Sequence, residues 1–361
     1  MNKNSSIAIV AGIAIAIAVI ASVLAYSGTS NDSTPMESPE QANLVPQAEK
    51  ITILTSFYPY HEFTKNVAGD FADVKQFMPN GVEAHDWEPR AQEIQSLKDA
   101  DVFVYNGLGM ESYIENIIES GEFDNVVFLK ASEGVELLKF EDDHDDHAKH
   151  DDHDDHDDHD EHAKEDDHDD HDEHKEGGHD GHDHDYEFDP HIWLDPILVK
   201  QQVNVIRDGL IQVDPDNKEN YEENARIYND KLDALDMKIG SALSSCQKDT
   251  IVPYHNAFTY LGERYDIHIM ALGGMAPDSE ASAAEIAEFV DFVKDNDIKV
   301  IFSEELVDPR LAEVIAEEAN AQVMLFSPLE ALSKEEAATN VSYIDKMEDN
   351  LDSLKVALEC Q

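Results

Sequence analysis

The stretch DNKENYEENARIYNDKLDALDMKIGSALS, at residues 216–244, decides the architecture of the chain. Its apolar positions are Tyr221, Ala225, Tyr228, Leu232, Leu235, Ile239 and Ala242. Alternating steps of four and three residues place all of them on one face of a helix. We therefore predict one uninterrupted helix about 40 Å long, since each helical residue advances the chain by about 1.5 Å. The competing interpretation of such a seam is a coiled-coil dimer.

Short strands and helices alternate on both sides of this stretch. Strands are predicted at residues 51–55, 73–78, 102–105, 126–129, 250–254, 267–272, 299–302 and 322–326. Helical patterns separate them, and Ser282 with Glu285 forms a capping-box signature before one of the helices. Strands separated by helices indicate βαβ units with parallel pairing. We predict an α/β fold of two lobes, each with a parallel sheet flanked by helices, joined by the long helix as a rigid backbone.

The N-terminus carries an uncharged apolar run at residues 7–26, at the border between a signal peptide and a membrane-spanning helix. A proline-containing tether follows it, with no cysteine that a lipid anchor would need. We expect an extracytoplasmic monomer, either tethered to the membrane by this segment or secreted after its cleavage. The predicted segments are a signal or membrane anchor at 1–26, a flexible tether at 27–49, an N-terminal lobe at 50–215, the connecting helix at 216–245 and a C-terminal lobe at 246–361.

A low-complexity run, EDDHDDHAKHDDHDDHDDHDEHAKEDDHDDHDEHKEGGHDGHDHD, occupies residues 141–185. It has 24 Asp or Glu against three Lys, and no aromatic residue, Leu, Ile or Val. Because it cannot bury enough apolar surface to fold, we predict disorder. Imidazoles flanked by carboxylates suit divalent transition metals, which predicts weak accessory sites in a collector or sensor loop; an acidic spacer is the alternative. The histidines of the run are His144, His147, His150, His153, His156, His159, His162, His168, His171, His174, His179, His182 and His184.

Charge and cysteine content restrict the class of protein. Lys and Arg number 25 against 80 Asp and Glu, a formal net charge of −55. This acidity argues against nucleic-acid binding, which needs a basic surface, and is compatible with a cationic substrate. The two cysteines, Cys246 and Cys360, fit an exported protein, and we predict that they form a disulfide. Two unpaired thiols are the alternative.

Three histidines outside the run, His85, His191 and His255, lie where a strand or loop gives way to a helix. In parallel α/β sheets, ligands bind beyond the carboxyl ends of the strands. We therefore expect these histidines to converge in the cleft between the lobes. Glu304 follows a predicted strand and is the candidate fourth ligand, with Asp308 as the alternative. Asp308 also has a simpler explanation as the N-cap of a helix.

Five motifs, taken in order, carry a resemblance to a known family. They are SFYPYHEFTKNVAGD (56–70), PNGVEAHDWEPRAQEIQSLKDADVFVYNGLGMESYIE (79–115), DPHIWLDP (189–196), HNAFTYL (255–261) and GGMAPDSEAS (273–282). In this combination the chain resembles the zinc and manganese substrate-binding proteins of ABC transporters over residues 50–358. The resemblance implies two α/β lobes joined by a rigid helix, with a metal held in the cleft. It also implies an ABC permease and its ATPase as partners, and a carrier rather than an enzyme.

Carried over residue by residue, the resemblance implies metal ligands at His85, His191 and His255, with Glu304 or Asp308 as the carboxylate. Three imidazoles and one carboxylate suit tetrahedral zinc, whereas manganese prefers more oxygen ligands. A histidine-rich insert just before the DPHIWLDP-type motif is also typical of zinc carriers in this family. We predict Zn²⁺ as the transported ligand, with manganese or another divalent metal as the alternative. Two other functions stay open, a zinc-dependent hydrolase and an extracellular zinc buffer without a transporter.

Overall fold

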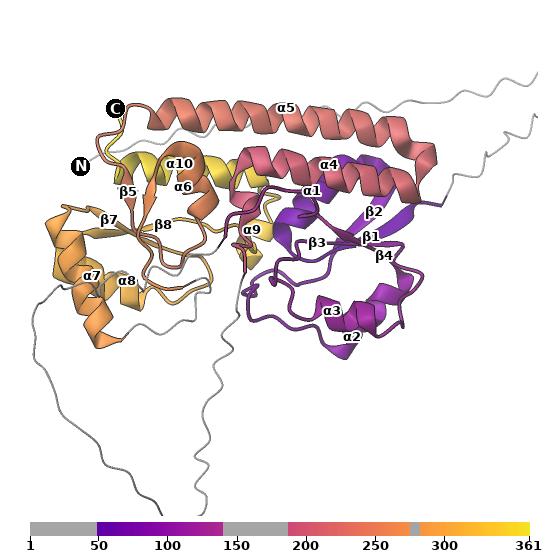
Figure 1. The fold of residues 1–361 in the computed structure, drawn as a ribbon, viewed down its shortest axis with the longest axis horizontal. Helices are drawn as coiled ribbons and strands as arrows, with labels where there is room; N and C mark the ends of the chain where they lie inside the picture. The colour runs from indigo at the N-terminus through magenta and orange to yellow at the C-terminus, as the bar shows by residue number, and fades with distance from the viewer. Residues whose placement is uncertain (1–48, 140–186, 275–281) are drawn as a thin grey trace, which may run out of the picture. The chain divides into compact units, whose positions relative to one another are not determined.

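A computed structural model describes residues 49–139, 187–274 and 282–361 (Figure 1). The long helix is present as α5 (Lys218–Leu243), about 39 Å long at about 1.5 Å per residue. Its buried residues are Tyr221, Ala225, Tyr228, Leu232, Leu235 and Ile239. These are the predicted seam, and all six belong to the core of the single chain. The seam is therefore used within one chain, against the coiled-coil interpretation.

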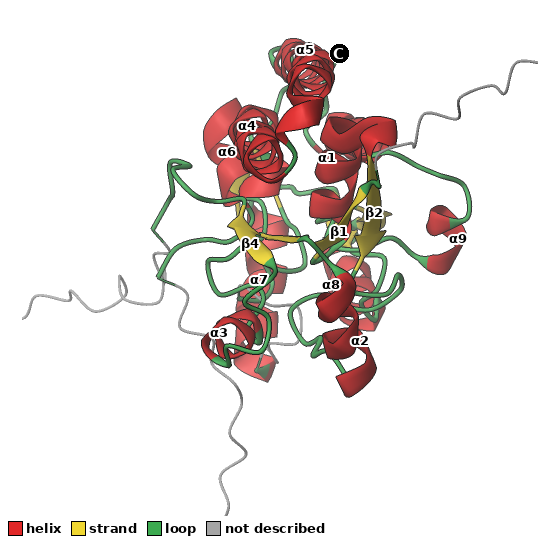
Figure 2. Ribbon diagram, turned by 90° about the vertical axis from the view of Figure 1, so that its right-hand side faces the viewer, coloured by secondary structure: helices red, strands yellow, loops and turns green. Residues whose placement is uncertain are grey.

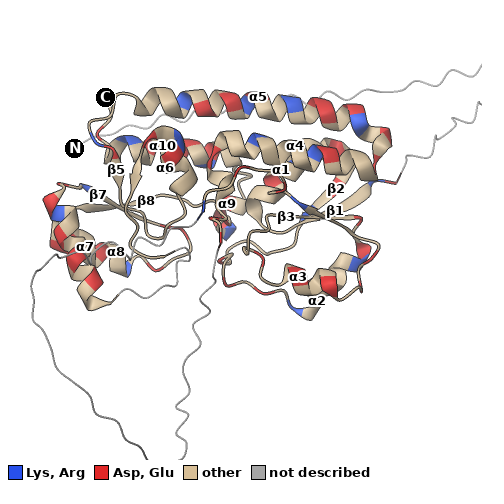
Figure 3. Ribbon diagram, viewed as in Figure 1, with Lys and Arg blue, Asp and Glu red and all other residues tan. Residues whose placement is uncertain are grey.

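Helix α5 packs on elements from both halves of the chain. It contacts α1 (Tyr58–Ala68) and α4 (Pro196–Val213), which precede it, and α6 (Thr259–Tyr265) and α10 (Tyr343–Ala357), which follow it (Figure 1). Acidic and basic residues are interspersed along its length (Figure 3). The helix is thus the shared support of the two halves, as the sequence predicts.

The first half forms one parallel sheet in the order β2-β1-β3-β4. Its strands are β1 (Ile51–Thr55), β2 (Ala72–Gln76), β3 (Val102–Tyr105) and β4 (Val127–Lys130). Helices α1 and α4 lie on one side of this sheet, and the short helices α2 (Ala91–Ser96) and α3 (Ile114–Glu119) on the other (Figure 2). Apolar residues fill both faces, which explains why β3 is buried at every position.

The second half has parallel pairs β5 (Thr250–Ile251) with β6 (His268–Ile269) and β7 (Val300–Ser303) with β8 (Gln322–Leu325). Phe302 N donates to Val252 O over 2.8 Å, which ties the two pairs together. The first pair is shorter than predicted, because Pro253 has no N–H to continue it. The remaining helices are α7 (Ala283–Asp295), α8 (Arg310–Ala319) and α9 (Lys334–Ala337), and the capping box predicted before α7 is present.

A disulfide joins Cys246 to Cys360, which confirms the predicted pairing. It fastens the end of the chain beside the segment that leaves α5, where the N–H groups of Gln247 and Lys248 both donate to Leu358 O. Within the described ranges, no helix is both long and apolar enough to cross a membrane. The predicted anchor at 1–26, nearly all of the tether and the histidine-rich run at 141–185 lie outside those ranges.

Candidate metal centre

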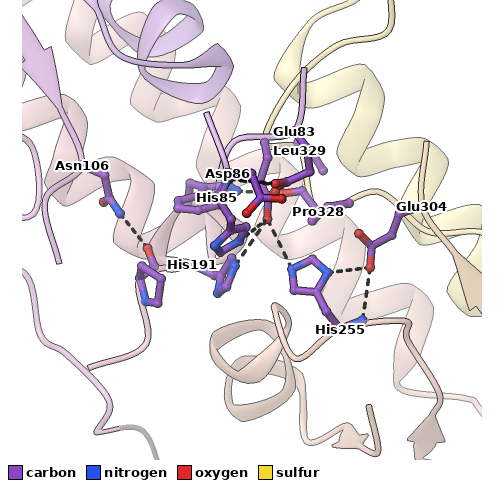
Figure 4. Close-up of polar contacts among 12 residues, drawn as sticks. Glu83, His85, Asp86, Asn106, His191, His255, Glu304, Pro328 and Leu329 are labelled. Atoms are coloured by element: carbon purple, nitrogen blue, oxygen red, sulfur yellow. Dashed lines mark hydrogen bonds and ion pairs between the residues drawn. The ribbon is translucent and has the colours of Figure 1, made fainter. Parts of the chain in front are cut away.

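His85 lies in an irregular segment between β2 and α2, and its ring is buried. The carboxyl group of Glu83 shapes this segment, because its oxygens accept from His85 N over 3.1 Å and from Asp86 N over 3.2 Å. These hydrogen bonds fix the loop so that the His85 imidazole faces the other two histidines (Figure 4). The first candidate ligand is therefore placed by local hydrogen bonds rather than by a strand or helix.

His191 lies immediately before the short 3₁₀ turn Ile192–Leu194, which leads into α4. The carboxylate of Asp189 accepts from both His191 N, over 2.9 Å, and His191 Nδ1, over 2.8 Å. Both side chains are almost completely buried. An imidazole that donates from Nδ1 keeps a lone pair on Nε2, so Asp189 selects the form of His191 that can bind a metal through Nε2.

His255 follows β5, and Glu304 follows β7, so neighbouring strand ends bring the two together. Glu304 Oε1 accepts from His255 Nδ1 over 2.6 Å and from His255 N over 3.2 Å. The arrangement repeats the one between Asp189 and His191. In each case a buried carboxylate fixes the ring through Nδ1 and leaves Nε2 directed at the same region (Figure 4).

Glu330 is the carboxylate at the centre of the cluster. Its Oε1 lies 3.3 Å from His85 Nε2, 3.4 Å from His191 Nε2 and 3.3 Å from His255 Nε2. One ligand atom from each of these four residues falls within 4.8 Å of the others, and all four are buried. Among the described residues, this is the group of His, Cys, Asp or Glu side chains arranged to hold a metal ion.

The backbone before Glu330 is held in an uncommon conformation. Leu329 has φ +58°, in the left-handed region that a residue with a branched side chain rarely adopts. Ser327 stabilises it by accepting from Leu329 N over 3.2 Å, and Asn350 makes two hydrogen bonds of 2.8 Å to the backbone of Ser327. Backbone strain of this kind persists where the surroundings over-determine it, often at functional sites.

The Nε2 atoms of His191 and His255 are buried and have no hydrogen-bond partner in the described part of the chain. Glu330 Oε1 lies within ion-pair distance of each, at 3.4 Å from His191 Nε2 and 3.3 Å from His255 Nε2. Buried polar nitrogens normally find a partner, because an unmet one costs about 1–3 kcal/mol. Two Nε2 atoms that face one carboxylate oxygen without hydrogen-bonding to it fit a metal ion, whose ligands point at the ion and not at each other.

Burial and the neighbouring carboxylates set the protonation of the cluster. Burial would raise the pKa of Glu330, but the three imidazoles outweigh it and hold that pKa well below its ordinary value. Burial would lower the pKa of His191 and of His255, but their carboxylate partners raise both, that of His255 strongly. For His85 burial prevails, and the pKa falls. Protons on these rings therefore compensate the buried carboxylates, and a divalent cation could replace them.

Glu83 adds a second carboxyl group beside Glu330. Burial, together with the charge of Glu330, raises the pKa of Glu83 to about 9, so this group is protonated at neutral pH. It lines a small cavity with Glu304, Glu305 and Glu330, at the edge of the cluster. A neutral Glu83 can donate to Glu330 while its other contacts shape the His85 segment.

The structure brings together the three histidines that the sequence nominates, but not the predicted fourth ligand. Glu304 lies behind His255 and holds its Nδ1, so its place in the cluster is taken by Glu330. The alternative, Asp308, is exposed and bonded to Arg310, because it precedes the first turn of α8. Glu330 follows strand β8, so the rule that nominated Glu304 after β7 would also have nominated Glu330.

Residues 53–357 match the family model described as zinc-uptake complex component A, periplasmic. The chain belongs to this family, ZnuA. The resemblance to the zinc and manganese substrate-binding proteins is thereby confirmed, and ZnuA proteins are transport components. The predicted α/β architecture with a long helix is also the architecture of ZnuA-like structures.

Several ZnuA relatives align along most of the chain. The high-affinity zinc uptake system protein ZnuA of Bacillus subtilis is 36% identical over 313 residues, covering 86% of this chain and 89% of that protein. The zinc-binding lipoprotein AdcA of Streptococcus pneumoniae is 36% identical over 310 residues, but this chain spans only 55% of its length. The crystal structure of the Zn(II)-bound ZnuA-like domain of that AdcA has a TM-score of 0.67 at 33% identity, covering 86% of this chain and 100% of the domain.

Proposed function

We propose that this chain binds one zinc ion through Nε2 of His85, His191 and His255 and the carboxylate of Glu330, and delivers it to an ABC-type importer. The observation that carries this proposal is the buried four-residue cluster, whose ligand atoms lie within 4.8 Å of one another. The zinc-binding relatives of known structure support the choice of metal.

The donor set has the chemistry of a tetrahedral zinc site. Three imidazole nitrogens at about 2.0–2.1 Å and one carboxylate oxygen at about 2.0–2.2 Å are ordinary zinc ligands in proteins. Asp189 and Glu304 hold the Nδ1–H groups of His191 and His255, so both rings present a lone pair at Nε2. Manganese, the alternative cargo, prefers more oxygen than this set offers.

Zinc binding must displace protons from the cluster. His191 and His255 both have a raised pKa, and only a neutral imidazole binds a metal. Glu330 is ionised throughout, since its pKa is held well below its ordinary value. Proton release therefore accompanies capture, and proton uptake favours release. Burial of the three rings reduces competition from water and salt for their ligand atoms.

Delivery requires that the importer distinguish the zinc-loaded protein from the free one. The ligands come from both sides of α5 in sequence, with His85 and His191 before it and His255 and Glu330 after it. Zinc would therefore hold the two halves in one relative orientation, which a permease coupled to an ATPase could recognise. Helix α5 packs on both halves, so we expect a small tilt on zinc binding. A large change of the radius of gyration in solution scattering would contradict this.

The proposed location is outside the cytoplasm, with residues 1–26 as the anchor or signal. The disulfide between Cys246 and Cys360 and the periplasmic description of the family support this location. Fractionation of cells that produce the full chain tests it. A protein found with its thiols reduced in the cytoplasmic fraction would contradict it.

Zinc titration of matched variants tests the assignment of the site. One variant has His85, His191 and His255 changed to Ala, and the other lacks residues 141–185. We expect the triple substitution to abolish tight one-to-one binding, which the deletion should preserve. The reverse pattern would move the transported ion to the histidine-rich run. Turnover of ester substrates by the zinc-loaded protein above background would instead revive the hydrolase alternative.

A further inference from the structure

Helix α6 begins four residues after His255 and belongs to the second half of the chain, yet it contacts the 3₁₀ turn that follows His191. Two side chains one helical turn apart, Tyr260 and Arg264, reach across to the segment that carries His191. The rings of His191 and His255 lie 5.4 Å apart between centroids, although they come from different halves. The distance between these two rings determines whether one ion can bind both, so the contacts that set this distance matter for the site.

Arg264 binds the residue that starts α4. Its Nε lies 3.0 Å and 2.9 Å from the two carboxylate oxygens of Asp195, and its Nη2 lies 2.7 Å from Oδ2. Asp195 is buried and also accepts from Ile197 N over 2.7 Å, as the N-cap of α4. A forked guanidinium–carboxylate contact is directional, so it fixes the angle between α6 and the start of α4.

Tyr260 binds on the other side of His191. Its hydroxyl donates to the backbone carbonyl of Asp189 over 3.0 Å and accepts from Leu138 N over 3.0 Å. The tyrosine is buried, and the carboxylate of the same Asp189 holds Nδ1 of His191. Tyr260 therefore acts on the candidate ligand His191 through Asp189, which it contacts at the backbone.

Helix α6 is itself fixed to the second half. Gly262 lies between the two contact residues, and a Cβ there would come within 2.7 Å of Ile267 O. Gly262 O also accepts from Ile267 N over 3.0 Å, just before β6. The close approach holds the helix against the segment that leads into β6, the partner of β5. Tyr260 and Arg264 thus extend from a helix that is packed against the same half of the chain as His255.

We propose that Tyr260 and Arg264 are positioning residues of the metal centre: they attach α6 to both flanks of His191 and so set its ring against His255. This inference rests on the proposed zinc binding. The two residues touch no ligand atom, and they act by holding Asp189 and Asp195. Their role is to form the His191–His255 half of the site before the ion arrives.

Tyr260→Phe removes one hydroxyl and keeps the packed ring, while Arg264→Gln removes the fork. Tyr265→Phe is the matched control, because this neighbouring tyrosine bonds to Asp236 on α5 and not to the His191 segment. We expect zinc dissociation constants, measured by chelator competition on the full chain, to rise by up to about tenfold for the first two variants, the low end of the range for residues that support metal ligands. The control should match the unmodified protein, and Arg264→Lys should recover part of the loss.

The visible absorption of bound Co²⁺ reports the geometry of the metal site. A loss of folding stability alone would not change these bands. Tyr260→Phe and Arg264→Gln should change the bands of the tetrahedral complex, and Tyr265→Phe should not. Unchanged affinity and unchanged bands in Tyr260→Phe would overturn the inference, whatever the melting temperatures, and would do so even if Arg264→Gln failed to fold. If the unmodified protein did not bind zinc, the proposed function would fail and this inference with it.

Discussion

Changing Glu304 to Gln separates an orienting carboxylate from a metal ligand. In the structure Glu304 touches His255 only at Nδ1 and the backbone N, whereas Glu330 faces the Nε2 atoms of all three histidines. A glutamine at 304 can still accept both hydrogen bonds through its amide oxygen. The substitution therefore removes the charge but leaves the geometry and the Nε2 lone pair of His255 in place.

The expected loss follows from the kind of hydrogen bond. A bond to a charged group contributes about 1.5–3 kcal/mol, against about 0.5–1.5 kcal/mol for a neutral one. The difference, about 1–1.5 kcal/mol, corresponds to a rise of about tenfold in the zinc dissociation constant. Glu330→Gln removes the anionic ligand itself. The zinc dissociation constant should therefore rise by more than about 100-fold, which is the upper range for changes to residues that support the ligands.

Chelator competition at constant pH and ionic strength measures all the variants on one scale. Asp308→Asn is the matched control, because Asp308 is an exposed carboxylate on the same loop that is bonded to Arg310 and not to a histidine of the cluster. It should bind zinc as the unmodified protein does. Equal losses in Glu304→Gln and Glu330→Gln would refute the assigned roles, as would a large loss in Asp308→Asn.

Three further predictions concern pH, the disulfide and a buried lysine. Zinc affinity should rise with pH through neutrality, because protons compete for His255, whose pKa is held well above its ordinary value; titrations from about pH 5.5 to 8 that showed a flat profile would contradict this. Reduction of the Cys246–Cys360 disulfide should lower the free energy of unfolding by about 4–5 kcal/mol in the loop-entropy model, and equal denaturation midpoints with and without reductant would count against it. Lys346→Met should lower that free energy by about 3–5 kcal/mol, because it leaves Glu305 and Glu336 without their buried cation.

Lys238→Met is the control for the buried lysine. Its partner is Glu348, and the two side chains are 51% and 41% exposed, so water screens the pair. The change in unfolding free energy should stay within about 1 kcal/mol. A loss as large as that of Lys346→Met would show that burial does not decide the energetics of these pairs.

The fold was predictable where a periodic apolar pattern must be buried. The seam of α5 is one such pattern, since six of its seven predicted positions are fully buried and the other, Ala242, packs partly against the same core. The capping box at Ser282 and Glu285 is another local signal that survives in the structure. Strand pairing in the second half was less predictable. Pro253 ends the regular pairing of β5 with β6, but Leu272 N and Gly273 N still donate to the carbonyls of Pro253 and Tyr254.

The site was predictable as far as strand ends define it. His255 comes four residues after β5 and Glu304 directly follows β7, whereas the DPHIWLDP motif, and not a strand end, marks His191. The choice between Glu304 and Glu330 was not local, because both follow a strand. It depends on the left-handed turn at Leu329 and on Asn350, 23 residues from the serine that it holds. No sequence pattern connects those positions.

Anomalous diffraction at the zinc edge, from crystals of the protein loaded with one equivalent of zinc, tests the central claim most directly. The account predicts one strong peak about 2.0–2.1 Å from Nε2 of His85, His191 and His255 and about 2.0–2.2 Å from a carboxylate oxygen of Glu330. Glu304 should remain on Nδ1 of His255. A peak ligated by Glu304 in place of Glu330, or one lying away from the three histidines, would contradict it.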